Sequence, residues 1–358
     1  MKTIAIWAPL RYANYGDDLQ ALAFGQMIKN MGYSVKLYQL EESLANAYGM
    51  QSVNTINELC EGVNLCIIAG GALLTPFSRV KRLLHKAAIE YEHDFKELLS
   101  ATYKFPQIKF CAISIGGDGL MREPSKWYSK ARINFFKSDA FIDGTVRLAG
   151  DANVMKQFGK NFIYYPDMLF CTPKYFGYDK LENTRKFRVG INFKKGKYLD
   201  KKLLSDIYKY AENNDDVEFH FTTTHMQKVG LNYQYIPEKE SRNIFIDCYK
   251  SPSQLLGVLA SMDLFITSML HLGLTGLSVR TPFISYRGPS KTKSFLKSIG
   301  GEWAIVDDHI SFEDLRKNYF SKTRKELYNQ YDRNIIEDME AQSVKQYEFC
   351  KMTVENFA

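Results

Sequence analysis

The stretch from Phe265 to Phe295 places a histidine between an apolar run and a cluster of cations. The segment Asp263–Thr267 is typical of a buried parallel strand, and we expect Ser268 to cap the helix that follows. His271 would then lie in the first helical turn, where unsatisfied amides and the positive end of the helix dipole favour an anion. A histidine there can bind a phosphate or carboxylate and lend it a proton. Three interpretations stay open: a buried structural histidine, a sugar-nucleotide site, and a site for a small phosphorylated acid.

Cations follow this stretch closely. Arg287, Lys291 and Lys293 come directly after a second apolar segment, Thr281–Tyr286, which we expect to be the neighbouring parallel strand. Because parallel strands end at the same edge of a sheet, these side chains would lie one strand away from His271. Cations at that edge can hold the charge of a phosphate or carboxylate, which favours a functional histidine over a buried structural one.

A second basic group lies between Arg185 and Lys202, where eight lysine and arginine residues accompany Asp200 as the one acid. The whole chain has a net charge of +7. Such a group can be a solvated face or the lining of a cleft that attracts phosphate or carboxylate, and both interpretations stay open. No nucleic-acid-binding motif accompanies the charges, so we expect no nucleic-acid partner.

Two consecutive carboxylates follow the first apolar segment. Asn14 and Gly16 suit a tight turn from strand to helix, and we expect Asp17 or Asp18 to cap that helix. One aspartate suffices as a cap, which leaves the other to point into a cleft or simply into solvent. A carboxylate at a helix N-terminus stays ionised, so it suits hydrogen bonds to sugar hydroxyls better than contact with a phosphate.

Two glycine pairs follow apolar segments that we expect to be strands. Gly70-Gly71 and Gly116-Gly117 would lie at the carboxyl edge of the sheet, where ligands of open α/β sheets gather. Neither pair belongs to a dinucleotide fingerprint or a phosphate-binding loop. A plain backbone turn is therefore the simpler interpretation of each.

A chain of 358 residues is too long for one compact core and suits two domains. Its 45% of hydrophobic residues is typical of a globular protein. The six cysteines form no CxxC pair, so we expect reduced, buried thiols in a cytosolic protein, with no disulfide and no metal site. No segment approaches the roughly 20 apolar residues of a membrane span, and the N-terminus lacks a signal peptide, so membrane contact is expected to be peripheral at most.

Short apolar segments alternate with helix-like ones along the chain. Because the expected strands are apolar throughout, this alternation predicts an α/β fold with parallel sheets covered on both faces. The pattern restarts after a polar stretch at 171–186, so we expect two Rossmann-like domains, 1–178 and 187–325, with a cleft between them, and a C-terminal helical segment, 326–358. The main expected strands are 2–9, 34–40, 64–74, 108–117, 188–193, 217–225, 263–268 and 281–286, and the main expected helices are 18–31, 80–102, 251–262 and 269–278.

Over most of its length the chain resembles the polysaccharide pyruvyl transferase family. The stretch ITSMLHLGLTGLSVRTPFISYRGPSK, residues 266–291, is similar to the family's S-R-L-H…G-x-P…Y…K signature. The order and spacing of several shorter motifs add to this similarity. They are Asn14-Tyr15-Gly16-Asp17 for the family's N-x-G-D, the glycine-rich turn at Gly70-Gly71, Val146-Arg147 with Tyr165-Pro166-Asp167 for its VR…PD pair, and Arg188–Phe193 for the opening strand of its second domain.

The chain departs from the family signature at two positions. Met269 stands where the family has an arginine, while Ser268, Leu270 and His271 are kept, and Leu272 replaces a glycine. An arginine would bind a phosphate or carboxylate through two fixed donors, which a methionine cannot do. We therefore expect a cation from a neighbouring loop, such as Arg287 or Lys291, to supply the charge, or else a different donor or a loss of activity.

The resemblance implies a GT-B-like pair of domains, with the acceptor sugar bound by the N-terminal half and the donor by the C-terminal half. It implies that a carboxyethylidene group moves from phosphoenolpyruvate to two hydroxyls of a sugar, forming a ketal and releasing phosphate. The acceptor would be a cell-surface polysaccharide, such as a capsule, exopolysaccharide or cell-wall glycan, or its lipid-linked precursor. Phosphoenolpyruvate is the donor substrate, and no cofactor or metal is implied.

The resemblance also implies roles for residues that match the family's motifs. His271 would be the acid that protonates the enol methylene, and Asp17 would orient or deprotonate the attacking hydroxyls. Arg147 and Asp167 fit a structural role better than a chemical one. The implied donor-binding residues are Ser268, Arg287, Lys291 and Arg147, and the implied acceptor-binding residues are Asn14, Asp17 and Gly71.

Two alternatives from other classes stay open. A glycosyltransferase of the same architecture would use a nucleotide sugar and need a carboxylate for its ribose, for which Asp307-Asp308 is a weak candidate. A non-catalytic member of a polysaccharide assembly complex is the second alternative, and Met269 is its best support. We expect the cytoplasm as the location, with at most peripheral contact with the inner face of the membrane, and homo-oligomers remain open.

Overall fold

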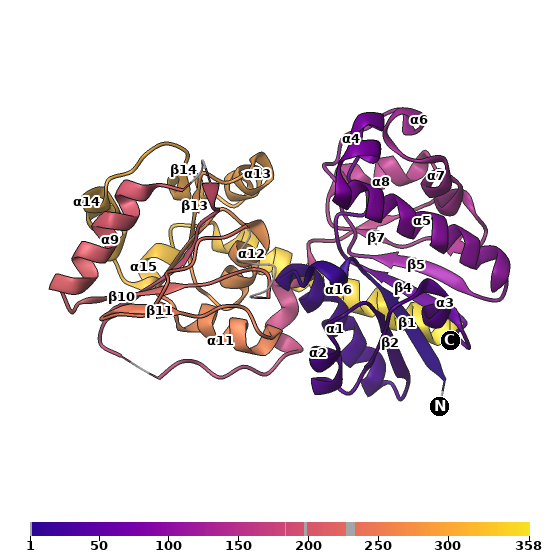
Figure 1. The fold of residues 1–358 in the computed structure, drawn as a ribbon, viewed down its shortest axis with the longest axis horizontal. Helices are drawn as coiled ribbons and strands as arrows, with labels where there is room; N and C mark the ends of the chain where they lie inside the picture. The colour runs from indigo at the N-terminus through magenta and orange to yellow at the C-terminus, as the bar shows by residue number, and fades with distance from the viewer. Residues whose placement is uncertain (1, 183, 197–198, 227–232) are drawn as a thin grey trace. The chain divides into compact units, whose positions relative to one another are not determined.

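The computed structural model describes residues 2–182, 184–196, 199–226 and 233–358 (Figure 1). Lys197, one of the cations between Arg185 and Lys202, therefore lies outside the described residues. The chain divides into two compact units. Unit 1 comprises Met1–Ala13, Asp17–Met168 and Ala341–Ala358, and unit 2 comprises Asn14–Gly16 and Leu169–Glu340.

Unit 1 is built on six parallel strands in the order β3-β2-β1-β4-β5-β6. Every residue of β4 is buried, so the sheet is covered on both faces, as the apolar run predicts. The strands are β1 Thr3–Trp7, β2 Ser34–Tyr38, β3 Gln51–Val53, β4 Leu65–Ala69, β5 Lys109–Ile113 and β6 Phe141–Ile142, and a short separate pair is β7 Thr145–Val146 with β8 Ile163–Tyr164. The helices are α1 Tyr15–Asn30, α2 Glu42–Ala47, α3 Ile56–Cys60, α4 Arg79–Leu84, α5 Lys86–Lys104, α6 Pro124–Trp127, α7 Lys130–Lys137 and α8 Ala149–Lys156.

Unit 2 repeats this plan with the order β11-β10-β9-β12-β13-β14, again all parallel. The strands are β9 Phe187–Asn192, β10 Val217–Phe221, β11 Ile244–Ile246, β12 Leu264–Thr267, β13 Phe283–Tyr286 and β14 Ile305–Val306. The helices are α9 Lys201–Asn213, α11 Pro252–Ser261, α12 Leu270–Ser278, α13 Ser290–Ser298, α14 Phe312–Leu315, α15 Arg324–Tyr328 and the C-terminal α16 Arg333–Phe357, whose last part belongs to unit 1.

In both sheets the strand order reverses once, between β1 and β4 in unit 1 and between β9 and β12 in unit 2. The helices that leave two such strands run to opposite faces, which opens a crevice beyond their carboxyl ends. The predicted α/β fold, with two Rossmann-like parallel sheets and a C-terminal helix, is confirmed. Each unit is therefore expected to bind a ligand at this crevice, beyond β1 and β4 in unit 1 and beyond β9 and β12 in unit 2.

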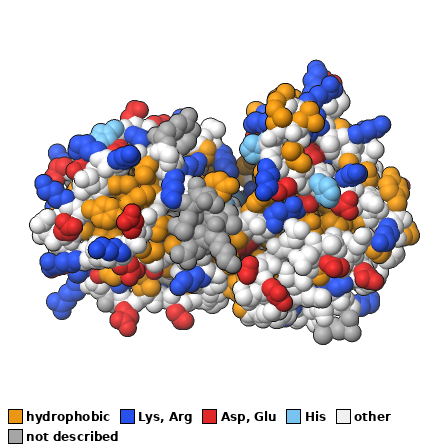
Figure 2. Space-filling model, viewed as in Figure 1, with side chains coloured by type: hydrophobic (Ala, Val, Ile, Leu, Met, Phe, Trp, Pro, Cys, Tyr) orange, Lys and Arg blue, Asp and Glu red, His pale blue; other side chains and the backbone are white. Residues whose placement is uncertain are grey.

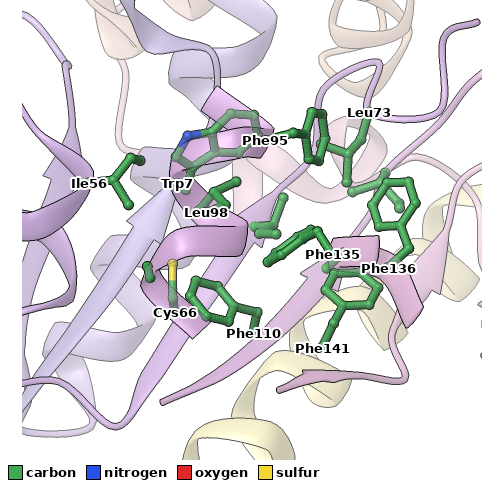
Figure 3. Close-up of a cluster of buried hydrophobic side chains, with 14 of the residues drawn as sticks. Trp7, Ile56, Cys66, Leu73, Phe95, Leu98, Phe110, Phe135, Phe136 and Phe141 are labelled. Carbon is green, nitrogen blue, oxygen red and sulfur yellow. The ribbon is translucent and has the colours of Figure 1, made fainter. Parts of the chain in front are cut away.

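Aromatic side chains fill the core on one face of the first sheet (Figure 3). Phe95 from α5, Phe110 from β5, Phe135 and Phe136 from α7 and Phe141 from β6 are fully buried. Five pairs of these rings have centroids 5.1 to 5.9 Å apart in tilted or edge-on arrangements. Such packing stabilises the unit through burial of apolar area and fixes the helices on the sheet.

The first helix begins earlier than predicted, because Asn14 and not an aspartate caps it. The Asn14 side-chain Oδ1 accepts a hydrogen bond from the amide of Gly16 at 3.0 Å, and α1 starts at Tyr15. The prediction of a helix from Asp18 with Asp17 or Asp18 as its cap was therefore wrong. Both aspartates lie in the first turn, with Asp18 buried and Asp17 half-buried.

The long helix predicted over 80–102 is divided in two. His85 has extended backbone angles, φ −100° and ψ 112°, and separates α4 from α5. The two helices differ in their packing. α5 buries a face that includes Ala88, Tyr91 and Phe95, whereas α4 has no buried residue. Because α4 buries no apolar face against the core, packing does not hold it in line with α5, and the chain can bend at His85.

Three further properties bear on the class of protein. All six cysteines are buried, with free thiols. Across the described ranges, no helix combines the length and apolar character needed to cross a membrane. Nor do three or more His, Cys, Asp or Glu side chains from those ranges gather as a metal would require.

Candidate functional site

Hydrogen bonds tie together the strand ends at the reversal point of unit 2. The side-chain amide of Asn192, the last residue of β9, donates to the carbonyl of Thr222 at 2.9 Å. Asn192 Oδ1 accepts from the hydroxyl of Thr267, the last residue of β12, at 3.2 Å. All three residues are fully buried. The crevice beyond β9 and β12 therefore has a rigid floor.

The same threonine positions the start of α12. Thr267 Oγ1 accepts from the amide of Met269 at 2.9 Å, and Met269 occupies the N-cap position. The predicted cap by Ser268 was therefore wrong. His271 is the second residue of α12, so its predicted place in the first turn is confirmed. Ser268 is only 4% exposed, and its hydroxyl has no hydrogen-bond partner among the described residues.

Two cavities lie at this edge of the sheet. The larger one, of about 460 Å³, is lined by Lys194, Lys195, Gly196, His225, Tyr233, Gln234 and Met269. The smaller one, of about 10 Å³, has room for about one water molecule and is lined by Phe193, Lys194, Ser268, Tyr286 and Arg287. Lys194 lines both cavities. Its side chain forms no ion pair within the part of the chain that the structure describes.

The structure thus brings Ser268 and Arg287 together and adds Lys194. Arg287 follows β13 in the left-handed backbone region, at φ 49°, and forms an ion pair with Asp200 at 3.5 Å. Asp200 is buried and also accepts from Tyr286 Oη at 2.9 Å and from His309 Nδ1 at 2.7 Å. Although burial alone would raise the pKa of Asp200, hydrogen bonds from the Leu203 amide, His309 and Tyr286 lower it to about 2. The ionised carboxylate therefore anchors Arg287 beside the smaller cavity.

The other predicted cations lie on α13. Lys291 is an exposed residue in its first turn. Lys293 forms an ion pair with Asp307 at 2.6 Å. Asp307 is therefore paired, whereas its neighbour Asp308 is exposed, and the ribose-binding role considered for Asp307-Asp308 stays a prediction.

A hydrogen-bonded group at the larger cavity was not foreseen from the sequence. His225 Nδ1 lies 3.0 Å from Thr224 Oγ1, and Gln234 exchanges two hydrogen bonds with Thr224, at 2.7 Å to its amide and 2.5 Å to its hydroxyl. On its other side, His225 Nε2 lies 3.3 Å from Asn14 Nδ2. Burial lowers the pKa of His225. A histidine directly after an apolar strand was the one available signal.

Gly16 packs directly against His271. A Cβ atom added to Gly16 would lie 1.9 Å from His271 Nδ1, far closer than two such atoms can approach. Asn14–Gly16 and His271 both belong to unit 2. The third residue of the N-x-G-D motif is therefore a glycine because the imidazole occupies the space of a side chain.

In unit 1, a closed ring of hydrogen bonds joins the Gly71 turn to Asp167. Gln20 Oε1 accepts from the amide of Gly71 at 3.2 Å, and Gln20 Nε2 donates to Asp167 Oδ1 at 3.1 Å. Arg147 donates to Asp167 Oδ2 at 3.0 Å and to the Gly71 carbonyl at 3.3 Å. Because its amide is already bonded and its φ is +75°, Gly71 forms a backbone turn here. The donor-binding role of Arg147 stays a prediction.

The second glycine turn holds a carboxylate of its own. The amides of Gly117 and Gly119 donate to Asp151 at 2.7 and 3.0 Å, and Asp151 is buried. Those amides are therefore not available to a phosphate.

Asp17 lies near the Gly70-Gly71 turn: a Cβ added to Gly71 would be 3.7 Å from Asp17 Oδ1. The acceptor-side roles of Asp17, Asn14 and Gly71 remain predictions.

Comparison with solved structures shows the fold. A putative UDP-N-acetylglucosamine 2-epimerase from Listeria monocytogenes aligns with 92% of this chain and 90% of its own, at 9% identity and a TM-score of 0.58. The UDP-GlcNAc 2-epimerase from Neisseria meningitidis, bound to UDP-GlcNAc, covers 99% of both chains at 9% identity and a TM-score of 0.55. The glycosyltransferase SnogD from Streptomyces nogalater covers 99% of both at 11% identity and a TM-score of 0.50. These likenesses confirm the predicted GT-B-like architecture.

Comparison by sequence shows the family. No curated protein matches the chain significantly. The family model for polysaccharide pyruvyl transferase, in contrast, matches residues 14–288. That range begins at Asn14, which contacts His225, and ends just after Arg287 at the smaller cavity. The chain therefore belongs to the polysaccharide pyruvyl transferase family.

Proposed function

We propose that this protein transfers a carboxyethylidene group from phosphoenolpyruvate to two hydroxyls of a sugar, in a cell-surface polysaccharide or its lipid-linked precursor. One observation carries the proposal. The hydroxyl of Ser268 is buried without a hydrogen-bond partner at the start of α12, in a small cavity that Lys194 and Arg287 also line. A buried unsatisfied hydroxyl costs free energy unless a ligand pairs with it. Since this cavity has room for about one water molecule, a single oxygen of a phosphate or carboxylate would enter it, and two cations and a helix N-terminus suit such an oxygen.

Lys194 is the cation that we propose takes the place of the family arginine, which is Met269 in this chain. Both side chains line the larger cavity, so an ammonium lies beside the position where the family has a guanidinium. A lysine is a compact point charge on a flexible stem, so it would hold the anion with less directional constraint than an arginine. The loss of the family arginine is thus compatible with binding of a donor that carries both a phosphate and a carboxylate.

The reaction asks for an acid, a leaving-group clamp and a group that orients the acceptor. His271 would protonate the methylene carbon of phosphoenolpyruvate, which turns the neighbouring carbon into an oxocarbenium-like centre. One sugar hydroxyl adds to that carbon, the C–O bond to phosphate breaks, and the second hydroxyl closes the ketal. Lys194 and Arg287 would stabilise the departing phosphate. Asp17 would orient the hydroxyls and accept the proton of one of them, which then restores His271, while the proton of the other hydroxyl leaves on the phosphate.

Ligand binding to the purified chain tests the donor. Because a ligand that binds only the native state raises its unfolding temperature, phosphoenolpyruvate should do so and UDP should not. Ser268→Ala should weaken the phosphoenolpyruvate effect, whereas Ser253→Ala, a serine on α11, should not. With a soluble glycan, the wild type should release phosphate and form a ketal methyl group visible by NMR. Stabilisation by UDP alone would indicate a glycosyltransferase, and stabilisation by neither ligand would indicate a non-catalytic protein.

A further inference from the structure

The helix α4 presents apolar side chains to solvent. Val80, Leu83 and Leu84 are 64%, 75% and 79% exposed, and no residue of α4 is buried. Single exposed apolar residues are common, but three on one short helix form a patch of the kind that marks an interaction surface. At 3.6 residues per turn, positions 80, 83 and 84 lie on one side of the helix.

Cations border this apolar side on both flanks. By the same helical spacing, Lys81 lies beyond Leu84 and Arg79 lies beyond Leu83, while the half-buried Arg82 lies toward the opposite side of the helix. None of these three cations forms an ion pair within the described residues. The segment 78–89 contains four lysine and arginine residues and no acid. Lys86, at the start of α5, pairs with Glu90 at 3.8 Å, so the unpaired positive charge of this surface is that of Arg79, Lys81 and Arg82.

A second exposed apolar pair lies at the same end of unit 1. Leu120 and Met121 are exposed in the segment before α6. The amide of Phe77, just before α4, donates to the carbonyl of Trp127, the last residue of α6, at 3.1 Å. Figure 1 places α4 and α6 at one end of the unit, and Figure 2 shows hydrophobic and basic side chains side by side there. The neighbouring acids Asp118 and Glu123 are paired with Arg122 and Lys126.

We propose that α4, with its cations Arg79, Lys81 and Arg82, is a surface that docks onto a bilayer containing anionic phospholipid. An amphipathic segment with apolar side chains between unpaired cations suits a bilayer, because the apolar part enters the headgroup region while the cations meet lipid phosphates. A second copy fits this surface poorly, since a two-fold contact would place the same unpaired cations against one another. The inference goes beyond the proposed reaction and does not depend on its donor.

Vesicle binding by the full chain tests the proposal. The wild type should sediment with vesicles that contain phosphatidylglycerol, bind phosphatidylcholine vesicles far less, and lose binding as salt is raised. Leu83→Gln with Leu84→Gln should lower the partition coefficient about tenfold or more. Neutralising Arg79, Lys81 and Arg82 to glutamine should lower it on the order of a hundredfold, since each cation near an anionic surface contributes about fivefold.

Matched controls use exposed positions of the same unit. Tyr103→Gln changes a side chain as exposed as Leu83, and a triple change of Lys96, Lys104 and Lys137 to glutamine removes the same charge. Neither control should alter binding.

The proposal is overturned if the wild type does not bind anionic vesicles or if the α4 variants bind as well as the controls. Self-association that the α4 variants abolish, without vesicle binding, would also overturn it and assign the surface to a second copy. Activity on a soluble glycan should be unchanged in the α4 variants, so this test and that of the proposed reaction can fail separately.

Discussion

The side-chain amide of Asn14 donates to Nε2 of His225, 3.3 Å away. The orientation of that amide is determined by its other contact, because Asn14 Oδ1 accepts from the Gly16 amide. His225 Nε2 must therefore be the unprotonated acceptor, which leaves the ring proton on Nδ1, facing the Thr224 hydroxyl. A family motif in the first part of the chain thus holds a neutral histidine at the wall of the larger cavity.

This histidine makes stability depend on pH. Burial lowers the pKa of His225 below its ordinary value of 6.5, so between the two values the unfolded chain binds more protons than the folded one. The free energy of unfolding should therefore fall as the pH is lowered below about 6.5. His225→Gln should remove this part of the pH dependence. Urea unfolding from about pH 7.5 to about pH 5.5 would measure it.

The exposed His85 supplies the control, because His85→Gln changes a ring that lies in water. That variant should keep the slope of the wild type over the same pH interval. An unchanged slope in His225→Gln would mean that His225 is not the group responsible.

The contact between Gly16 and His271 predicts a strong coupling between the two positions. If His271 is the general acid proposed above, Gly16→Ala should displace the imidazole and lower kcat nearly as much as His271→Ala does, on the order of a hundredfold. In the His271→Ala background, Gly16→Ala should have little further effect, since the ring that it meets is gone. Steady-state kinetics of the four proteins measures this cycle.

Gly177→Ala is the matched control, because a Cβ at Gly177 meets no atom within 4 Å and its backbone does not require glycine. It should leave kcat unchanged. Additive effects of Gly16→Ala and His271→Ala would contradict direct displacement of the ring.

An arginine at position 269 should be able to replace the charge that Lys194 supplies. Lys194→Ala should weaken phosphoenolpyruvate binding about tenfold or more, as expected for loss of a charge-assisted contact. Met269→Arg should restore affinity in the Lys194→Ala background, because the new guanidinium would reach the same cavity. Isothermal titration gives both affinities. Lys202→Ala, which removes an exposed lysine paired with Asp206, should change neither.

If the double variant Lys194→Ala with Met269→Arg binds phosphoenolpyruvate as weakly as Lys194→Ala alone, the arginine does not replace the lysine. The anion would then lie outside the larger cavity.

The ion pair of Arg147 with Asp167 should stabilise unit 1 strongly. Asp167 is buried and the side chain of Arg147 is only 11% exposed, so Arg147→Ala would leave a buried carboxylate without its cation and should cost about 3–5 kcal/mol of unfolding free energy. The exposed pair of Arg242 with Asp215 is the comparison, and Arg242→Ala should cost less than about 1 kcal/mol. Chemical denaturation measures both. If Arg147→Ala lowers the free energy of unfolding as little as Arg242→Ala does, Arg147 is not needed for stability and its predicted donor-binding role is favoured.

Much of the fold could be predicted, because its signals are local. The apolar run at Leu65–Ala69 and the segment Leu264–Thr267 both form buried parallel strands, as runs of that length and composition should. The position of His271 in the first turn of α12 follows from its distance to the end of β12. Helix starts were less certain, since Asn14 and Thr267 compete for capping roles with Asp17 and Ser268.

The site itself required contacts between distant segments. Lys194 and Met269 are far apart in the sequence and line the same cavity because β9 and β12 are neighbours in the sheet. His225 gains its partner Asn14 only through folding, and the break at His85 depends on which residues of α4 and α5 find a core to pack against.

By itself, the sequence determined the strands, the family motifs and the excess of positive charge, since these depend on the residue types and their spacing along the chain. Only the tertiary structure decided which cations line the cavities beside Met269, which carboxylates are already engaged, and which apolar side chains stay in water. The physical reason is that pairing and burial are properties of three-dimensional neighbours, and hydrogen bonds and ion pairs act only over a few ångströms.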